Sequence, residues 1–425
     1  MRVVVVGGGV VGLASAYRLA DAGCDVVVTE ARATGSAATH GNAAKIALAE
    51  TGPVPAPGVI LQALRWMLKP DSPLYVKPSV APAFVKFMLT MARYCTERDF
   101  RFGLQTHLRL AADATDLLDE YARDGIDFEL HAAGVLLAFE SRKRYEEHCR
   151  SLPVFEGFGM HPTHLDRDGV EATEPALSPR IQHGLFFADD RQVEPDSLSR
   201  GLVKRCEELG VKIRENTGIR HFHRRGATVA GVVTESGELI AGDVLLLAAG
   251  VWSGPLSKKL GAPMPIRPGK GYSIDYRPAP IRLRTSLTLE DARVAVTPLD
   301  GMLRLAGTME FGGFDESVNP TRVAGIRRAA QENLVGWDNP PGEAAPWAGL
   351  RPMTPDGRPV IGKFGNLHNA YIASGHGMLG LALAPGTAEV ITDLITTHSD
   401  RMPPEVSAAV SPDRFLGSRA RRGIR

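Results

Sequence analysis

The sequence predicts an α/β protein in which a Rossmann-like domain is interleaved with a second, α+β domain built on a mixed or antiparallel sheet. Residues 1–30 read as strand, glycine turn, helix and strand, which is one complete βαβ unit. Two later blocks, 195–250 and 347–396, are again rich in Val, Leu, Ala and Gly. The stretches between the blocks carry most of the aromatic, proline and charged residues and indicate mixed helix and strand.

Each block divides into elements in chain order. The first contains the strand VVVV, the turn GGGVVG, the helix LASAYRLADAG and the strand CDVVVTE. The second begins with the helical pattern LSRGLVKRCEELG, continues through the strand VKIRE and a hairpin-like stretch, and ends in the buried strand VLLLAAG. The third begins near Trp347 and ends in an apolar helix from about Gly380 to Thr396.

These elements predict two discontinuous domains. The Rossmann-like domain combines residues 1–50, 190–255 and 345–400, and the second domain combines 51–189 and 256–344. Residues 401–425 are expected to be a C-terminal tail, because their last part is rich in arginine and is typical of a solvated chain end.

Composition excludes several classes of protein. The chain has 425 residues, and its 49 Lys and Arg balance 48 Asp and Glu, which gives no charge footprint for a nucleic-acid partner. The four cysteines form no CxxC pair, which argues against a disulfide scaffold or a cysteine zinc site. We find neither a spanning apolar segment nor a signal peptide and expect a cytoplasmic protein without a metal.

The first turn fits a dinucleotide-binding fingerprint. Gly7, Gly9 and Gly12 match GxGxxG directly after a strand, and Glu30 ends the second strand. Glycines let the backbone approach a pyrophosphate, a helix beginning near Val10 offers free N–H groups, and the glutamate can accept both ribose hydroxyls.

Three separated segments favour FAD over NAD. The first is the fingerprint, the second is a small-residue run containing HGNAA, and the third is the strand end LLLAAGVW. A long, buried FAD needs several segments around it, whereas NAD enzymes seldom do. The residues expected to bind the cofactor are Gly7, Gly9, Val10, Val11, Gly12, Glu30, Ala31, Arg32, His40, Gly41, Asn42, Ala43, Ile219, Ala248, Ala249, Gly250, Trp252, Gly377, Met378, Leu379 and Gly380.

Nearly the whole chain resembles the D-amino-acid oxidase and glycine oxidase superfamily of FAD amine oxidoreductases, and most closely the bacterial D-amino-acid dehydrogenases. The resemblance is carried by the fingerprint, by THGNAAKI and DVLLLAAGVWS, and above all by WAGLRPMTPDGRPVIG and SGHGMLGLALAPGTAEVITDLI. It implies non-covalent FAD and oxidation of an amino-acid Cα–N bond to an imine, which water hydrolyses to a 2-oxo acid and ammonia.

The chain departs from relatives at two points. Relatives that attach flavin covalently near GLRP use a cysteine there, but this chain has no cysteine after Cys206. Dehydrogenase members often have Thr and Trp around the GHG motif, where this chain has Met378 and Leu381.

Four residues are candidates for the chemistry. The resemblance implies that Arg351 in GLRP holds the substrate carboxylate, a role that suits a planar guanidinium. His376 precedes the C-terminal helix, whose amides are suited to stabilising a reduced flavin, and Tyr272 and Arg304 belong to strands that are placed to cover it. The alternatives are a surface arginine, a histidine satisfied by backbone in its glycine turn, and ordinary sheet residues.

Residues 57–105 carry a net charge of +4 and apolar residues at helical spacing, which also occurs in basic helices on anionic lipid. The apolar positions are Ile60, Ala63, Leu64, Met67, Phe84, Phe87, Met88, Met91 and Tyr94. Packing on the protein's own core is the alternative to peripheral contact with the inner face of the cell membrane. A quinone acceptor would be reached at such a surface.

Three functions follow from these patterns. The first is a D-amino-acid dehydrogenase with a non-oxygen acceptor such as a quinone, whose substrates include proline-type ring amino acids such as D-proline or D-hydroxyproline. The second is a glycine- or sarcosine-type oxidase that forms hydrogen peroxide. The third is a flavin-bearing subunit of a larger hetero- or homo-oligomeric assembly.

Overall fold

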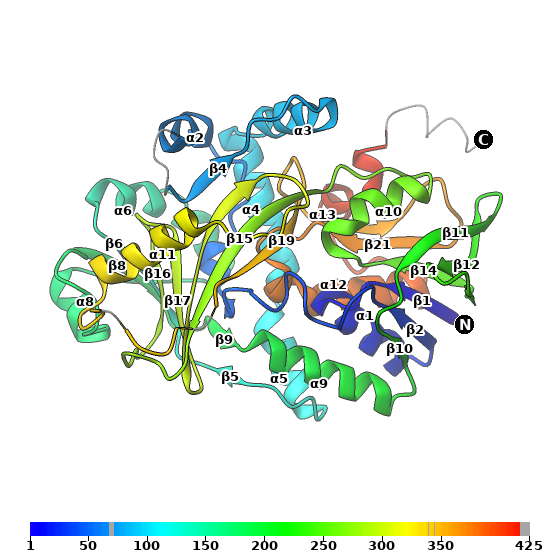
Figure 1. Cartoon of the computed structure of the whole chain (residues 1–425), viewed down its shortest axis with the longest axis horizontal. Coiled ribbons are helices and arrows are strands. Elements are labelled where there is room, and N and C mark those ends of the chain that lie inside the picture. Colours follow the sequence, from blue (N-terminus) through cyan, green and yellow to red (C-terminus); the bar gives the residue numbers. More distant parts are fainter. Residues whose placement is uncertain (68–71, 339, 344, 417–425) are drawn as a thin grey trace.

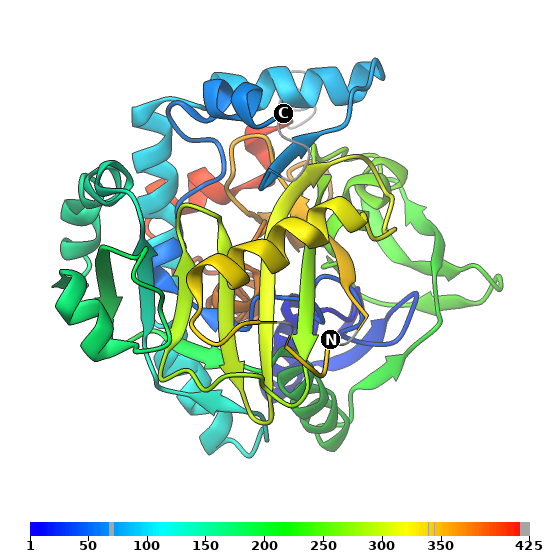
Figure 2. The ribbon, with the colours of Figure 1, turned by 60° about the vertical axis from the view of Figure 1, so that its left-hand side comes forward.

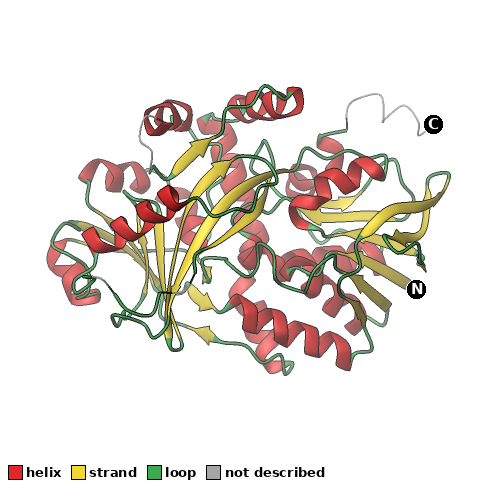
Figure 3. Cartoon of the chain, in the orientation of Figure 1, coloured by secondary structure: helices red, strands yellow, loops and turns green. Residues whose placement is uncertain are grey.

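The computed structural model describes residues 1–67, 72–338, 340–343 and 345–416. Figure 1 shows two sheets at opposite ends of the molecule, with helices around and between them. Figure 3 shows how the strands gather into these two groups. The predicted α/β fold, in which a Rossmann-like sheet is interleaved with a mixed sheet, is confirmed.

The first sheet has six strands and is parallel apart from one edge pair. Its order is β10 (Lys212–Arg214), β2 (Asp25–Thr29), β1 (Arg2–Val6), β14 (Val244–Leu247), β21 (Ala370–Ser374) and β20 (Val360–Lys363). Strand β1 is a run of valines because both faces of a central parallel strand are buried.

Helices cover one face of this sheet and a small sheet covers the other. On the first face pack α1 (Val10–Asp21), α9 (Pro195–Glu208) and α12 (Gly380–Thr396). The other face contacts α10 (Ser253–Lys259) and the three strands β11 (Ile219–Arg225), β12 (Thr228–Thr234) and β13 (Leu239–Ala241). Buried apolar side chains on both faces stabilise this half of the molecule.

The larger, mixed sheet has nine strands. In order they are β19 (Trp347–Met353), β15 (Arg267–Tyr276), β18 (Met302–Phe311), β17 (Val294–Leu299), β16 (Ser286–Leu289), β6 (Val135–Phe139), β8 (His183–Phe187) and β7 (Thr163–Leu165), with β4 (Leu74–Val76) paired to β18. Figure 2 shows α11 (Pro320–Asn333) lying across one face of this sheet. Strand β19 falls within the range predicted for the Rossmann-like domain, but it pairs with β15.

The remaining elements connect or cover the two sheets. A small sheet contains β3 (Lys45–Ile46), β9 (Arg191–Val193) and β5 (Leu130–His131). The helices are η1 (Leu48–Glu50), α2 (Val59–Met67), α3 (Pro82–Arg93), α4 (Glu97–Ala111), α5 (Ala114–Arg123), α6 (Arg142–Cys149), α7 (Leu152–Glu156), α8 (Arg167–Thr173), η2 (Gly250–Trp252), α13 (Pro404–Val410) and η3 (Pro412–Arg414).

Two segments differ from their simplest sequence interpretation. In the basic segment 57–105, the side chains of Phe87 and Met91 are buried against β18 and β19, so much of the α3 apolar stripe packs on the protein's own core. The side chains of Leu64 and Met67 lie outside the described part. Part of the predicted tail is ordered, because α13 buries Val406 and Val410; residues 417–425 lie outside the described chain. No described helix has the length and apolar character needed to cross a membrane.

Candidate active site

A cavity of about 890 Å³ lies where the carboxyl ends of β1, β14 and β21 face the inner surface of the mixed sheet. Its size suits a cofactor and a small substrate. Of the predicted cofactor residues, all but Gly12 and His40 line it: Gly7, Gly9, Val10, Val11, Glu30, Ala31, Arg32, Gly41, Asn42, Ala43, Ile219, Ala248, Ala249, Gly250, Trp252, Gly377, Met378, Leu379 and Gly380. Arg351 and His376 line it as well.

The glycine turn and the first residues of α1 form part of the cavity wall. Gly9 precedes the helix without a side-chain cap, so the first-turn N–H groups have no capping carboxylate or hydroxyl from that residue. One of them, on Val10, donates to the Thr39 hydroxyl at 3.1 Å. The positive end of the helix dipole therefore faces a cavity lined by small residues, an arrangement suited to a pyrophosphate.

Gly12 has a packing role in this turn. A Cβ at this position would lie 2.0 Å from the Gly7 carbonyl oxygen, so only glycine lets α1 approach the turn this closely. Gly7 itself has a φ of +117° and lies against the backbone of Ala248. The fingerprint glycines thus join β1, α1 and the end of β14 at the edge of the cavity.

Arg351 lies on β19 at the other end of the cavity. Its Nη1 donates to the Thr308 carbonyl at 2.7 Å, and no carboxylate in the described part of the chain pairs with it. Burial lowers the pKa of the Arg351 guanidinium to about 10, which leaves it charged at neutral pH. A half-buried guanidinium that faces a cavity without a carboxylate partner is poorly compensated, so this geometry favours an anionic ligand.

The turn before α12 places His376 at the cavity wall. Its Nε2 shares a hydrogen bond of 3.0 Å with the Thr387 hydroxyl, and burial lowers the pKa of the imidazole to about 3, with a smaller effect from His107. The side chain is therefore neutral across the physiological range. The N-terminus of α12 follows, has no side-chain cap and lines the same cavity.

Tyr272 and Arg304 do not line the cavity. Tyr272 lies in the hydrophobic cluster beneath α11, and its hydroxyl donates to Glu310 at 2.8 Å. Arg304 is buried and donates to the carbonyl oxygens of His40 and Asn42 at 2.9 and 3.0 Å while pairing with Asp275. It holds the loop that forms the cavity wall.

His40 points out of the main cavity toward α9. Its Nδ1 lies 2.8 Å from an Asp196 carboxylate oxygen, and this hydrogen bond raises the pKa of the imidazole. The neighbouring residues Gly41 and Asn42 reach the cavity, so the loop as a whole still approaches the ligand space.

Comparison with known proteins decides the family. The family described as FAD dependent oxidoreductase matches residues 2–394. The chain belongs to this FAD-dependent oxidoreductase family. It is 35% identical to a D-amino acid dehydrogenase of Cereibacter sphaeroides over 100% of this chain and 98% of the relative. It is 33% identical to a D-amino acid dehydrogenase of Bradyrhizobium diazoefficiens over 98% of this chain and 99% of the relative.

Solved structures share the fold of this FAD-dependent oxidoreductase. Glycine oxidase from Geobacillus kaustophilus superposes with a TM-score of 0.77 at 22% identity, covering 98% of this chain and 100% of the other. L-Proline dehydrogenase from P. horikoshii superposes with a TM-score of 0.75 at 20% identity, covering 98% and 97% of the two chains. The cofactor of the family is FAD, and the cavity fits it, because the starts of α1 and α12, neither with a side-chain cap, both line the cavity together with many small residues.

Glu30 provides the first prediction for FAD binding. Its two carboxylate oxygens accept hydrogen bonds from the backbone N–H groups of Gly8 at 2.7 Å and Arg32 at 3.0 Å. Each oxygen retains a lone pair for a ribose hydroxyl, whereas in Glu30→Gln the amide nitrogen cannot accept one. We expect the variant to bind FAD about tenfold more weakly. Fluorescence titration of apoprotein with FAD measures this; an unchanged Kd would contradict the ribose role.

Sequence reasoning missed Trp347 at the start of β19. The indole lines the cavity and fills space that side chains at Gly41 and Gly349 would occupy, since a Cβ at either glycine would lie 1.8 Å from the ring. It also packs edge-on to His40 at a centroid distance of 5.6 Å. The signal was present as Trp-Ala-Gly directly before Leu350, but spacing alone does not show which side chain a glycine accommodates.

Sequence reasoning also missed a polar group at the cavity wall. Lys45, Glu50 and Thr288 all line the cavity and bind one another. The Lys45 ammonium lies 2.5 Å from the Thr288 hydroxyl and 2.6 Å from Glu50, and the Lys45 interaction helps to lower the pKa of the Glu50 carboxyl. Nothing in the local sequence joins Thr288 to Lys45 and Glu50, because it lies 243 and 238 positions from them along the chain.

Asp190 lies beside this group and predicts a pH effect on stability. The Leu48 N–H donates to its Oδ1 at 3.0 Å, and no described residue bonds to its Oδ2. Burial raises the pKa of the Asp190 carboxyl to about 7. The folded protein therefore retains a proton that the unfolded chain releases near pH 4. The tighter proton binding of Asp190 in the folded state therefore stabilises the protein fully below pH 4, and this stabilisation is lost as the pH rises through 7.

Asp190→Asn removes this titration and keeps an acceptor for Leu48. We expect the variant to raise Tm relative to wild type at pH 8 by about 2 °C or more, with a smaller gain at pH 5. Thermal unfolding at the two pH values measures the difference. An equal change in Tm at both values would show that burial does not shift this carboxyl.

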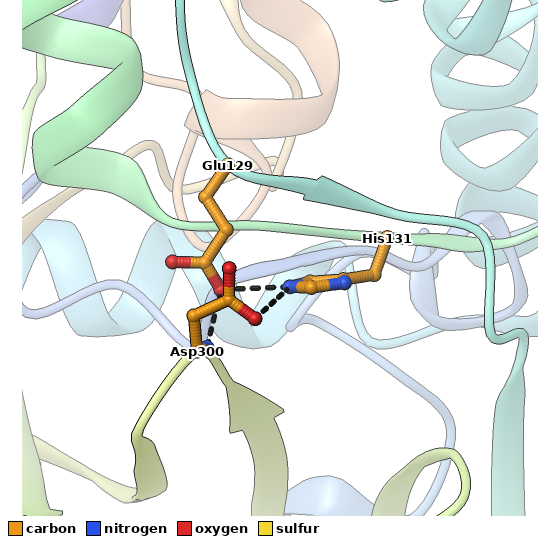
Figure 4. Close-up of side chains that lie close together, drawn as sticks. All are labelled: Glu129, His131 and Asp300. Carbon is orange, nitrogen blue, oxygen red and sulfur yellow. Dashed lines mark hydrogen bonds and ion pairs between the residues drawn. The ribbon is translucent and has the colours of Figure 1, made fainter.

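Among the described residues, one group of three side chains has ligand atoms close enough together for a metal ion: Glu129, His131 and Asp300 (Figure 4). The Glu129 carboxylate lies 2.8 Å from His131 Nε2 and accepts the Asp300 backbone N–H at 2.7 Å. These contacts connect β5 to the turn between β17 and β18. The group lies outside the residues that line the cavity.

Proposed function

We propose that this FAD-dependent oxidoreductase is a D-amino-acid dehydrogenase. Its reaction oxidises the Cα–N bond of a D-amino acid to an imine, and water then releases a 2-oxo acid and ammonia. The observation that carries the proposal is the half-buried, charged Arg351, which pairs with no carboxylate among the described residues and lies in the same cavity as the cofactor-binding turn. The names of the full-length relatives support the choice of D-amino acids and of a dehydrogenase.

The side chains orient the substrate and leave the redox step to the cofactor. FAD, held non-covalently, supplies a hydride acceptor for the substrate Cα–H. Arg351 binds the carboxylate and fixes the position of Cα. His376 is neutral and bonded to Thr387, so it is suited to positioning rather than to supplying charge. The N-terminus of α12 supplies a positive dipole at the cavity.

A dye-coupled assay with matched D- and L-amino acids tests the function. We expect primary D-amino acids to give one 2-oxo acid and one ammonia for each two-electron acceptor reduced. We expect a D-proline-type substrate to reduce the acceptor in the same ratio without ammonia, because hydrolysis of its cyclic imine opens the ring and leaves the nitrogen on the product. Hydrogen peroxide formed stoichiometrically in air would identify an oxidase instead. Turnover of neither enantiomer by FAD-loaded protein would favour a flavin-bearing subunit of a larger assembly.

The acceptor is proposed to be a membrane quinone that approaches along α2, β4 and α3. Helix α2 lines the cavity with Val59, Gln62 and Trp66. The outward face of the α2–α3 segment exposes apolar side chains at Ile60, Leu61, Val80, Val85 and Leu89 together with the basic residues Lys77, Lys86 and Arg93. Apolar and basic groups on one face suit an anionic lipid surface.

Co-sedimentation with vesicles tests this contact. We expect binding to vesicles of anionic phospholipid, weaker binding to zwitterionic vesicles, and loss of binding in the double variant Val80→Asp, Leu89→Asp. Val335, which is exposed and lies outside the α2–α3 segment just after α11, provides the control Val335→Asp. If the wild-type protein, the double variant and Val335→Asp sediment equally with anionic vesicles, the proposed surface is wrong.

A further inference from the structure

The polar group Lys45–Glu50–Thr288 has unused hydrogen-bonding capacity toward the cavity. The Lys45 ammonium has three N–H donors and binds Thr288 and Glu50. The Glu50 side chain remains 26% exposed, and its carboxylate has further lone pairs. The group can therefore offer both a donor and an acceptor to a ligand.

Stability of the fold does not by itself require this group. Lys45 is 3% exposed in its side chain, and burying a charged pair costs desolvation that apolar residues of similar size avoid. Arg293 and Glu290, which form an ion pair of 2.6 Å, also line the cavity. His148 lines it as well, and no described residue bonds to its Nε2. One end of the cavity is thus polar but balanced in charge.

The mixed sheet sets the spacing between this end and Arg351. The Arg351 guanidinium lies over Gly271 on β15. Two residues farther along this strand, Ser273 is in register with Ala306 on β18, Ala295 on β17 and Thr288 on β16. Ala306 and Ala295 are paired on the two strands between them, and both line the cavity. Three strand spacings separate β15 from β16, about 14 Å. The sheet therefore presents a floor of small residues between a carboxylate anchor and a polar end.

We propose that Lys45, Glu50 and Thr288 bind the end of the substrate side chain and select D-amino acids with a long side chain that ends in an uncharged donor and acceptor. A carboxamide fits this description, because it can accept from Lys45 and donate to Glu50. A terminal carboxylate would face Glu50, and a terminal ammonium would face Lys45. The inference rests on the proposed D-amino-acid oxidation and names its substrate class.

Anaerobic rapid mixing with D-glutamine and D-methionine, which have similar length, tests the inference through the flavin absorbance. The concentration dependence gives an apparent Kd and a limiting reduction rate for each substrate. We expect D-glutamine to exceed D-methionine at least about tenfold in the ratio of reduction rate to Kd. D-glutamate and D-lysine should both give a lower ratio of reduction rate to Kd than D-glutamine.

Thr288→Val and Lys45→Met should reduce the preference for D-glutamine by about tenfold, mainly through Kd. Thr285→Val is the matched control: Thr285 is also buried, its hydroxyl donates to the Gly134 carbonyl, and it does not line the cavity. Bound FAD, measured from the absorption spectrum, verifies that each variant folds. If Lys45→Met does not retain FAD, the preference for D-glutamine measured in Thr288→Val alone tests the inference.

The outcomes separate this inference from the proposed function. If D-methionine reduces the flavin as well as D-glutamine does, or if Thr288→Val keeps the preference, the polar group does not select the side chain although the enzyme oxidises D-amino acids. If no D-amino acid reduces the flavin, the proposed function itself is wrong.

Discussion

Arg351→Lys is expected to lower kcat/KM for D-amino acids by about 10²-fold, and Arg351→Ala by about 10³-fold. Lysine keeps the positive charge but cannot make two parallel hydrogen bonds to a carboxylate. The loss should be largest in KM and in the apparent Kd, because Arg351 binds a group that is charged before and after oxidation.

Steady-state kinetics on FAD-loaded protein measure this effect. Arg142→Lys is the control, since the Arg142 side chain is 80% exposed on α6. For a substrate that lacks the carboxylate, such as a primary amine with the same side chain, kcat/KM should differ little between wild type and Arg351→Lys. Unchanged turnover of D-amino acids by Arg351→Ala would remove the basis for carboxylate binding at this position.

Gly271→Ala is expected to lower kcat/KM by about 10²-fold, although residue 271 carries no functional group. An added Cβ would lie 2.1 Å from Arg351 Cζ and 2.1–2.2 Å from both terminal nitrogens, so the guanidinium must move. Gly271 thus positions Arg351 against the floor of the cavity. A shift of about 1 Å in a substrate-binding group is enough for an effect of this size.

A double variant identifies the route of this effect. Gly271→Ala should have little further consequence in an Arg351→Ala background, because both changes act on one interaction. Gly157→Ala is the control, since a Cβ there meets only backbone oxygens at 3.3 Å or more. Additive losses in the double variant would show that Gly271 acts on catalysis independently of Arg351.

Local sequence patterns predicted the parts of the site that local geometry builds. The GxGxxG turn, the uncapped start of α1 and the helix from Gly380 each depend on residues within one short segment. His376 directly precedes the same helix, whereas the role expected of Arg351 came from the resemblance of its GLRP segment to a known family. Both residues line the cavity.

Features that depend on register between distant strands were not predictable. Tyr272 and Gly271 are neighbours on β15, but alternation places the first beneath α11 and the second under Arg351. The alternation of side chains along a strand does not show which face of the sheet lies against the cofactor. The Lys45–Glu50–Thr288 group likewise forms only when β16 is placed beside the segment that follows the HGNAA run.

Anaerobic titration of the flavin with single D- and L-amino acids tests the central claim most directly. The account predicts a flavin absorption band in purified protein that D-amino acids bleach and their L-enantiomers do not, and that a quinone restores faster than air. A flavin band that no amino acid bleaches would contradict the assignment of D-amino acids as substrates, and bleaching by L-enantiomers alone would contradict its stereochemistry.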